Sequence, residues 1–169
     1  MTQQPPAPRA AVLTVSDAGS RGERVDTAGP VAVALLRDAG FYVALTALLP
    51  DEPAQIEATL KRWADIDGCV LIVTTGGTGL APRDRTPEAT TAVCDYLVPG
   101  IGEAMRAASL TITQMAMISR AIAGVRGRTL IVNLPGSEGG ARDNLNTVLP
   151  VLHHAVTLLA GSTAHTAQP

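Results

Sequence analysis

The stretch from Val70 to Thr91 reads VLIVTTGGTGLAPRDRTPEATT and gives the strongest indication of the fold. It opens with an apolar, β-branched run, Val70–Val73, which is typical of a strand buried on both faces of a sheet. The strand breaks at the glycine-rich run Gly76–Gly79. Farther on, Thr86 and Pro87 suit a helix start, the threonine as a cap and the proline as the first helical residue. A strand, a glycine turn and a helix N-terminus in this order expose backbone N–H groups that favour anions.

Asp84 lies between the glycine turn and the helix start, where a bare carboxylate would repel an anion. One explanation is structural: the glycines form only a tight turn, and Asp84 pairs with Arg83 or Arg85. The other explanation is that a metal ion bridges the carboxylate and the bound anion, and this is the interpretation we follow. The run is not a Walker A loop, because no Gly-Lys-Ser/Thr follows it, and it is not Gly-x-Gly-x-x-Gly either.

Length and composition limit the class of protein. At 169 residues the chain fits one domain and is long enough to bury a full core. The net charge of −2 and the 2% aromatic content argue against nucleic-acid binding and against binding to a membrane surface. The sequence lacks an apolar signal segment and a run long enough to span a membrane, so we expect a cytoplasmic protein. In that compartment Cys69 and Cys94 are expected to be reduced and buried.

Apolar runs alternate with helical patterns along the chain. Strands are expected at Ala10–Val15, Phe41–Leu49, from Val70, at Arg120–Val125 and at Thr129–Asn133. Helices are expected at Val31–Ala39, Ala54–Ala64, Pro87–Tyr96, Ile101–Leu110, Gly139–Thr147 and Pro150–Leu159, with Ala18–Asp26 as a loop and residues 111–119 either helix or loop. This alternation predicts an α/β sandwich with a mostly parallel sheet. We expect one domain at residues 10–161, a disordered tail at 1–9 and a flexible tail at 162–169.

Acids and glycines recur at the ends of the expected parallel strands. Four loops carry them: Ser16–Asp17, Pro50–Asp51, Thr75–Asp84 and Pro135–Ser137. Since parallel sheets bind ligands at the carboxyl ends of their strands, we expect these loops to meet. Each residue alone has an ordinary explanation: Asp17 and Asp51 as caps or solvated acids, Ser137 as an N-cap, and Arg120 and Arg142 as surface residues. The coincidence of all four loops is the argument for a functional site.

Several motifs resemble a family of molybdenum-cofactor biosynthesis proteins, over about residues 10 to 160. The family includes MogA, MoaB and the G domains of gephyrin and its plant counterpart. The most specific match is Thr74–Gly79 (TTGGTG) with the continuation Arg83–Ala89 (RDRTPEA). Further matches are Asn133–Gly136 (NLPG), Val15–Asp17 (VSD), Leu49–Glu52 (LPDE) and Ile118–Arg120 (ISR).

The resemblance implies a three-layer α/β/α domain, usually a homotrimer. Its Mog-type members are molybdopterin adenylyltransferases, which use Mg²⁺ to transfer AMP from ATP to the terminal phosphate of molybdopterin. Their product is then the substrate for molybdate insertion, so a molybdate-insertion enzyme is a possible partner. The aspartates that match Asp51 and Asp84 are the essential acids of that family, and we expect them to bind magnesium and to act in catalysis.

The remaining site residues are assigned by the needs of a reaction between two polyanions. Backbone N–H groups of Gly76, Gly77, Thr78 and Gly79, and those of Gly136 and Ser137, are expected to bind phosphate, and Pro135 in the same turn is expected to contact a substrate. The side chains of Ser16, Asp17, Thr78 and Ser137 are expected to contact nucleotide or pterin. Glu138 and Gln114 depart from prolines common in relatives, and the chain is compact, as MoaB proteins are. The alternative is therefore a MoaB-like pterin-binding or partner protein that transfers no AMP; an unrelated nucleotide-binding α/β protein is a weaker option.

Overall fold

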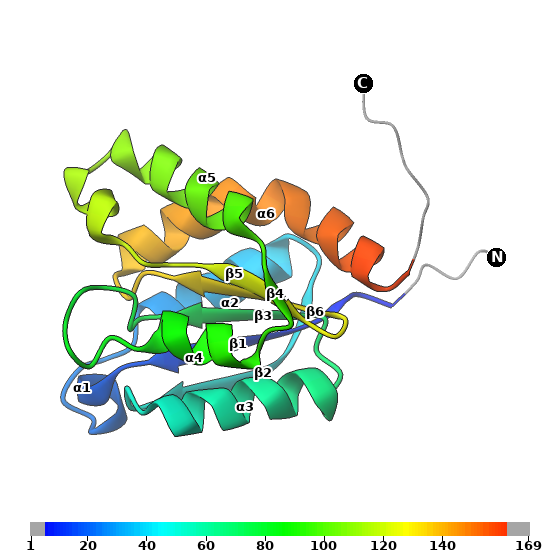
Figure 1. Cartoon of the computed structure of the whole chain (residues 1–169), viewed down its shortest axis with the longest axis horizontal. Helices are drawn as coiled ribbons and strands as arrows, with labels where there is room; N and C mark the ends of the chain where they lie inside the picture. The colour runs from blue at the N-terminus through cyan, green and yellow to red at the C-terminus, as the bar shows by residue number, and fades with distance from the viewer. Residues whose placement is uncertain (1–5, 162–169) are drawn as a thin grey trace.

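A computed structural model of the chain describes residues 6–161, and its centre is one six-stranded sheet (Figure 1). The strands are β1 (Arg9–Val15), β2 (Tyr42–Leu49), β3 (Leu71–Thr75), β4 (Tyr96–Leu97), β5 (Ala123–Arg126) and β6 (Thr129–Leu134), in the order β2-β1-β3-β6-β5-β4. The first four strands of that order are mutually parallel, whereas β5 and β4 are antiparallel to their neighbours. The predicted α/β class with a mostly parallel sheet is confirmed.

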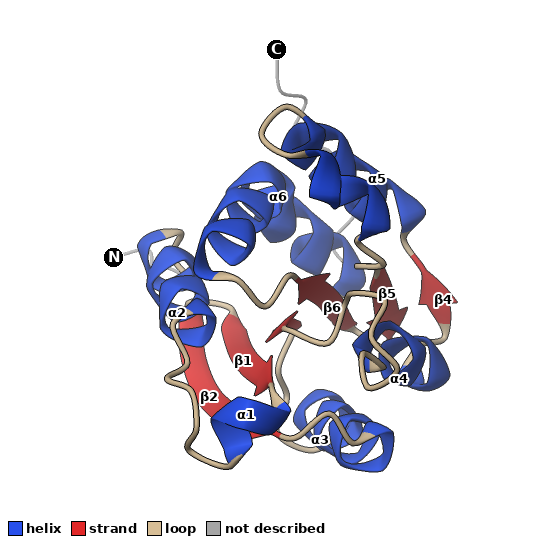
Figure 2. Ribbon diagram, turned by 90° about the vertical axis from the view of Figure 1, so that its left-hand side faces the viewer, coloured by secondary structure: helices blue, strands red, loops and turns tan. Residues whose placement is uncertain are grey.

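Helices cover both faces of the sheet (Figure 2). They are α1 (Asp17–Ser20), α2 (Ala28–Asp38), α3 (Pro53–Asp65), α4 (Thr86–Val93), α5 (Pro99–Leu110) and α6 (Glu138–Leu159), with a 3₁₀ helix, η1, at Gln114–Ile118. One core lies between the sheet and α2, α5 and α6, and a second lies between the sheet and α3 and α4. These two cores form the three layers that the family resemblance implied.

The strand β3 lies at the middle of both cores. Leu71 and Val73 face the first core while Ile72 faces the second, and all three are fully buried. Each such side chain contributes about 1.5–3 kcal/mol of hydrophobic stabilisation. This two-sided burial explains why the sequence here is apolar without alternation, and it holds the glycine turn that follows β3 in a fixed place.

The structure corrects two element predictions. One continuous helix, α6, replaces the two expected on either side of Pro150. The proline costs about 3 kcal/mol in a helix interior, but its ring faces solvent while Val148 and Leu152 stay buried in the first core, and this packing keeps the helix continuous. The expected helix over Pro87–Tyr96 is also too long, because the backbone becomes extended at Cys94 and Tyr96 then pairs with Val125 as part of β4.

Smaller differences concern helix starts and the chain ends. The four-residue α1 begins at Asp17 and overlaps the start of the stretch Ala18–Asp26 that was expected to be a loop. Thr86 does not cap α4: Arg85 is the N-cap residue, and the buried Thr86 hydroxyl has no hydrogen-bond partner among residues 6–161. Strand β1 begins at Arg9, within the tail predicted for residues 1–9. Residues 1–5 and the tail predicted at 162–169 lie outside the described residues. None of the helices within residues 6–161 combines the length and apolar character that a membrane crossing requires.

Candidate functional site

The carboxyl ends of the four parallel strands carry the loops that the sequence singled out. Asp17 follows β1, Asp51 follows β2, the turn of Gly76 and Gly77 follows β3, and Ser137 follows β6. Because these strands are parallel and adjacent, their ends share one edge of the sheet. The structure therefore brings together loops that are up to about 120 positions apart in sequence.

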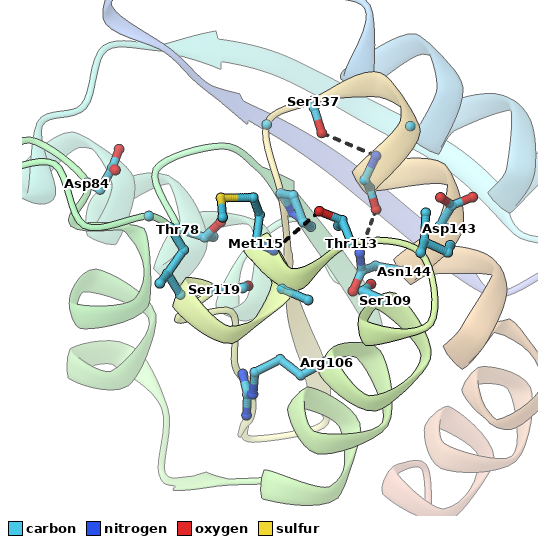
Figure 3. A pocket seen from close by; sticks show the side chains of 18 of the residues that line it. Thr78, Asp84, Arg106, Ser109, Thr113, Met115, Ser119, Ser137, Asp143 and Asn144 are labelled. Carbon is cyan, nitrogen blue, oxygen red and sulfur yellow. Dashed lines mark hydrogen bonds between the residues drawn. The ribbon is translucent and has the colours of Figure 1, made fainter.

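Two cavities open at this edge. A polar cavity of about 310 Å³, which we call the polar lobe, is lined by Thr14, Val15, Ser16, Gly19, Arg24, Val25, Asp26, Thr27, Asp51, Thr75, Gly76, Gly77, Asp84, Gly136 and Ser137. A wider and more apolar cavity of about 570 Å³, the apolar lobe, extends from Gly77, Thr78 and Gly79 to η1 and the start of α6 (Figure 3). Four residues line both lobes and form their shared wall: Gly77, Asp84, Gly136 and Ser137. Two ligands, one in each lobe, would meet at this wall.

The glycine turn depends on the absence of side chains. Gly76 and Gly77 have φ angles of 93° and 65°, a region that residues with a side chain rarely adopt. A Cβ on Gly76 would lie 2.2 Å from the carbonyl oxygen of Val15. The N–H of Gly76 donates to the Leu134 carbonyl at 3.1 Å, so the expected phosphate contact from this N–H is wrong. Among the described residues, no hydrogen bond uses the N–H groups of Gly77, Thr78 and Gly79, which leaves these three for a ligand.

Asp51 lies on the wall of the polar lobe and is only 9% exposed. Its Oδ2 accepts the backbone N–H of Asp17 at 2.9 Å. Its Oδ1 is buried and has no hydrogen-bond partner within residues 6–161. Burial raises the pKa of Asp51 above its ordinary value, and the nearby carboxylates of Asp17 and Asp84 add to this effect. A buried carboxylate oxygen without a donor fits a site whose missing partner is a cation.

Asp84 lies on the shared wall, beside the glycine turn. Its Oδ2 accepts the backbone N–H of Ala81 at 3.0 Å, and a Cβ on Gly79 would lie 2.7 Å from the same oxygen. Its carboxylate pairs with neither Arg83 nor Arg85, because Arg83 binds Asp17 and Glu52 instead. Asp84 is thus held in place by its own loop and keeps a carboxylate oxygen for another partner.

The structure brings Asp51 and Asp84 together on the polar lobe, as a shared metal ion requires. Among residues 6–161, no group of three or more His, Cys, Asp or Glu side chains could hold a metal ion. Two carboxylates nevertheless suit Mg²⁺, which proteins often bind through one or two carboxylates plus substrate phosphates and water. The donor set, with one orphaned oxygen on Asp51, therefore fits the ion that the family resemblance implied.

Asp17 differs from the expectation that it contacts a substrate, because it lines neither cavity. Its carboxylate accepts two hydrogen bonds from Arg83, at 2.9 and 3.0 Å, and a third from the backbone N–H of Asp51 at 3.0 Å. The Arg83 guanidinium, followed by the Asp51 N–H, lowers the pKa of Asp17 to about 2. Arg83 also binds Glu52 at 2.7 Å. The structure thus gives Asp17 a place between the loops of Asp51 and Asp84.

The remaining predicted residues line the lobes. Ser16 lies in the polar lobe and caps α1 through Gly19, at 3.0 Å. Thr78 is buried on the wall of the apolar lobe, which Pro135 also lines. Ser137 is the N-cap of α6, one of the two roles that the sequence allowed for it. Its Oγ accepts a hydrogen bond from the N–H of Gly140 at 3.2 Å. Since it also belongs to the shared wall, the cap and a ligand contact are compatible.

Sequence reasoning missed two parts of the site. The first is the apolar lobe's far wall, where Ser109, Thr113, Met115 and Ser119 come from the end of α5, η1 and the residues beside it (Figure 3). The exposed apolar side chains of this segment, from Ile112 to Ile118, were the available signal. The second is the role of Arg120, which the ISR match included but which was otherwise expected at the surface; it donates to the backbone carbonyls of Gly79 and Asp84.

Comparison with known proteins agrees with this geometry. A family model described as a probable molybdopterin binding domain matches residues 11–154. The chain is 42% identical over 156 residues to a molybdopterin adenylyltransferase of Helicobacter pylori, covering 89% of this chain and 87% of that protein. It is 40% identical over 158 residues to gephyrin of Dictyostelium discoideum, covering 88% of this chain but only 22% of gephyrin.

A solved structure is also similar along almost its whole length. The molybdopterin biosynthesis enzyme MoaB from Thermus thermophilus is 56% identical, with a TM-score of 0.86 over 91% of this chain and 97% of that one. The family resemblance inferred from the TTGGTG and NLPG motifs is thereby confirmed. The chain belongs to the family of probable molybdopterin binding domains.

Proposed function

We propose that the protein is a molybdopterin adenylyltransferase, which transfers AMP from ATP to the terminal phosphate of molybdopterin and releases pyrophosphate. The observation that carries this proposal is the shared wall, where two lobes meet at Gly77, Asp84, Gly136 and Ser137. A reaction that joins two separately bound molecules needs such a junction, because the reacting groups must come within about 3–3.5 Å. The H. pylori relative bears the name of this activity.

The reaction requires no side-chain nucleophile. A phosphate oxygen of molybdopterin attacks the α-phosphorus of ATP, the bond from that phosphorus to the bridging oxygen breaks, and the electron pair leaves with pyrophosphate. The obstacle is charge, because two unit negative charges about 4 Å apart repel by about 4 kcal/mol at an effective dielectric constant near 20. The protein must therefore supply positive potential at the shared wall.

The chain's own residues supply part of that potential. The N–H groups of Gly77, Thr78 and Gly79 can bind phosphate oxygens without adding net charge. The N-terminus of α6 at Ser137 adds the positive end of a 22-residue helix on the other side of the wall. The carboxylates of Asp51 and Asp84 would hold Mg²⁺, which when bound offsets phosphate charge and stabilises the transferring group. The buried, unpartnered Oδ1 of Asp51 supports this assignment.

The experiment is incubation of pure protein with ATP, Mg²⁺ and molybdopterin. The proposal predicts pyrophosphate release that depends on the pterin, together with a product whose mass equals molybdopterin plus the AMP group. The alternative, a MoaB-like protein that binds pterin without transferring AMP, has one observation in its favour: the 56% identity to a protein named MoaB. That alternative predicts saturable pterin binding with no pyrophosphate above the level without pterin.

A homotrimer, a cytoplasmic location and a molybdate-insertion enzyme as partner belong to the same proposal. Exposed apolar side chains support an oligomer, since patches of this kind mark interaction surfaces. Outside the lobes they are Tyr96, Leu97, Leu110 and Met117, whereas the exposed Ile112, Met115 and Ile118 line the apolar lobe. Sedimentation equilibrium tests the trimer: a mass of three chains supports it, and a single chain mass of 17.4 kDa contradicts it.

A further inference from the structure

The loop between Gly79 and Asp84 is held at both of its ends by one side chain, that of Arg120. Its Nε donates to the Gly79 carbonyl at 2.7 Å, and its Nη2 donates to the Asp84 carbonyl. Its Nη1 binds the carboxylate of Glu88 in the first turn of α4. The backbone N–H of Arg120 also donates to the carbonyl of Thr78 at 2.9 Å. One residue, 36 to 41 positions away in sequence, thus holds both ends of the loop.

The rest of the loop needs such an anchor. Within it, Asp84 and Ala81 exchange two hydrogen bonds, from the Asp84 N–H at 2.9 Å and to the Asp84 carboxylate at 3.0 Å. These bonds fix the carboxylate relative to the loop, but they do not tie the loop itself to the glycine turn; the nearest such tie lies beyond the loop, where the Thr86 N–H donates to the Gly77 carbonyl at 3.1 Å. Leu80 in the middle of the loop is 65% exposed and adds little packing. The other anchor, Arg83, binds Asp17 and Glu52 at the surface, where salt and water weaken ion pairs.

We propose that Arg120 is a positioning residue for the transfer reaction: it holds the Asp84 carboxylate on the shared wall by fixing the carbonyls of Gly79 and Asp84. Arg120 lines neither lobe, so it acts through Asp84 and not on a substrate. This inference rests on the proposed function, in which Asp84 takes part in adenylyl transfer. A planar guanidinium with donors at fixed spacing suits two carbonyls at once, whereas the single ammonium of lysine cannot reproduce that geometry.

The variants Arg120→Lys and Glu88→Gln separate positioning from general stability. Glu88 lies in a partly buried pair with Arg120, and its second oxygen has no partner among residues 6–161, so weakening the pair costs stability in either variant. Glu88→Gln leaves both loop carbonyls bound to Arg120 and is expected to keep kcat near the wild-type value. Arg120→Lys loses the paired guanidinium donors that bind the two carbonyls. It is expected to lower kcat by about 10- to 100-fold, because a shift of the Asp84 carboxylate by about 1 Å can cost up to about 100-fold in rate.

A double-mutant cycle with Asp84→Asn gives the decisive readout. If Arg120 acts through Asp84, Arg120→Lys lowers kcat in the wild-type background but causes little further loss in Asp84→Asn. Equal fold losses in the two backgrounds, or full activity of Arg120→Lys alone, would overturn the proposal. Comparable losses of kcat in Glu88→Gln and Arg120→Lys would assign Arg120 to stability alone and would also overturn it.

A second measurement does not depend on turnover, so failure of the adenylyltransferase proposal can be told from failure of this one. Hydrogen–deuterium exchange of a peptide that covers residues 79–85 is expected to be faster in Arg120→Lys than in wild type and in Glu88→Gln. Mn²⁺ binding, followed by electron paramagnetic resonance without nucleotide, is expected to weaken in Arg120→Lys and to persist in Glu88→Gln. Unchanged loop exchange and unchanged Mn²⁺ binding in Arg120→Lys would contradict the positioning role, whether or not pyrophosphate is released.

Discussion

Asp17 and Asp51 bind each other's backbone across the ends of two parallel strands. The N–H of Asp17 donates to Asp51 Oδ2 at 2.9 Å, and the N–H of Asp51 donates to Asp17 Oδ1 at 3.0 Å. Asp17 in turn accepts two hydrogen bonds from Arg83, the neighbour of Asp84 in sequence. The spacing of the two proposed magnesium-binding acids therefore depends on Asp17, although Asp17 lines neither lobe.

This relationship predicts graded effects of two substitutions at Asp17. Asp17→Asn keeps an oxygen that accepts the Asp51 N–H but weakens the ion pair with Arg83, whose side chain is 54% exposed. Asp17→Ala leaves the Asp51 N–H without its acceptor. Measured as kcat for pyrophosphate release, the loss is expected to be small for Asn and about 10-fold or more for Ala, since a displaced acid misaligns the reacting groups. Asp38→Asn, at an exposed position outside both lobes, is the control. Equal activities of the two Asp17 variants would contradict the claim that Asp17 positions the Asp51 loop.

Asp51→Asn is expected to raise stability while it lowers activity. Burial raises the pKa of Asp51 above its ordinary 3.8, so the folded chain binds this proton more readily than the unfolded chain. Its contribution to stability therefore falls as pH rises through the window above 3.8. Asparagine keeps an acceptor for the Asp17 N–H but carries no charge, so Tm at pH 7 should rise by about 2–4 °C for each kcal/mol gained. The difference should shrink as the pH falls below 3.8. Calorimetry at pH 7 and at about pH 3.5 tests this, and a lower Tm for the variant at pH 7 would contradict it.

The glycine turn predicts a contrast between two Gly→Ala variants. Gly76→Ala places a Cβ 2.2 Å from the Val15 carbonyl oxygen, in a backbone conformation with φ of 93°. Gly127→Ala also has a positive φ, of 56°, but its Cβ meets nothing within 4 Å. The second variant should lose about 1–2 kcal/mol of unfolding free energy from backbone conformation alone, and the first should lose clearly more. Urea unfolding measures both, and equal losses would mean that the close approach to β1 is relieved without cost.

The sequence predicted the sheet and the site loops well because local signals marked them. The apolar run of β3, the glycines after it and the NLPG turn each fix a structure within a few residues. The predicted helix break at Pro150 was wrong because the packing of Val148 and Leu152 into the core outweighs the cost of the proline. A short stretch of sequence around Pro150 does not show this packing. Tyr96 was wrongly expected to be helical. Its pairing with Val125 joins residues 29 positions apart, so no local sequence signal marks it as a strand residue.

The site residues show the same difference between local signals, which the sequence displays, and long-range contacts, which it does not. Asp84 stood out because it follows the glycine turn, whereas Asp51 was assigned through the family resemblance, and the structure places both on the polar lobe. Arg120 was missed because its partners, Gly79 and Asp84, are about 40 positions earlier in the chain, and a single arginine outside a helix carries no periodic signal. Asp17 was placed in the correct loop, but its ion pair with Arg83 spans 66 positions and was equally invisible.

Asp84→Asn is expected to preserve the fold, because the amide oxygen can still accept the Ala81 N–H that now binds Oδ2. The loss of its negative charge should lower kcat by roughly 10²-fold or more, the usual effect of removing one electrostatic element of a transition state. Circular dichroism and the unfolding midpoint test the fold. A Tm far below the wild-type value would mean that Asp84 is needed for structure before it is needed for chemistry.

The central claim is that the two lobes hold ATP and molybdopterin on either side of Asp84. The most direct measurement is pyrophosphate release by the wild-type protein and by Asp84→Asn, with ATP, Mg²⁺ and molybdopterin, each omitted in turn. We expect release by the wild-type protein only when all three are present, and a rate about 10²-fold lower for the variant. Pterin binding without pyrophosphate release by the wild-type protein, or equal release by both proteins, would contradict the claim.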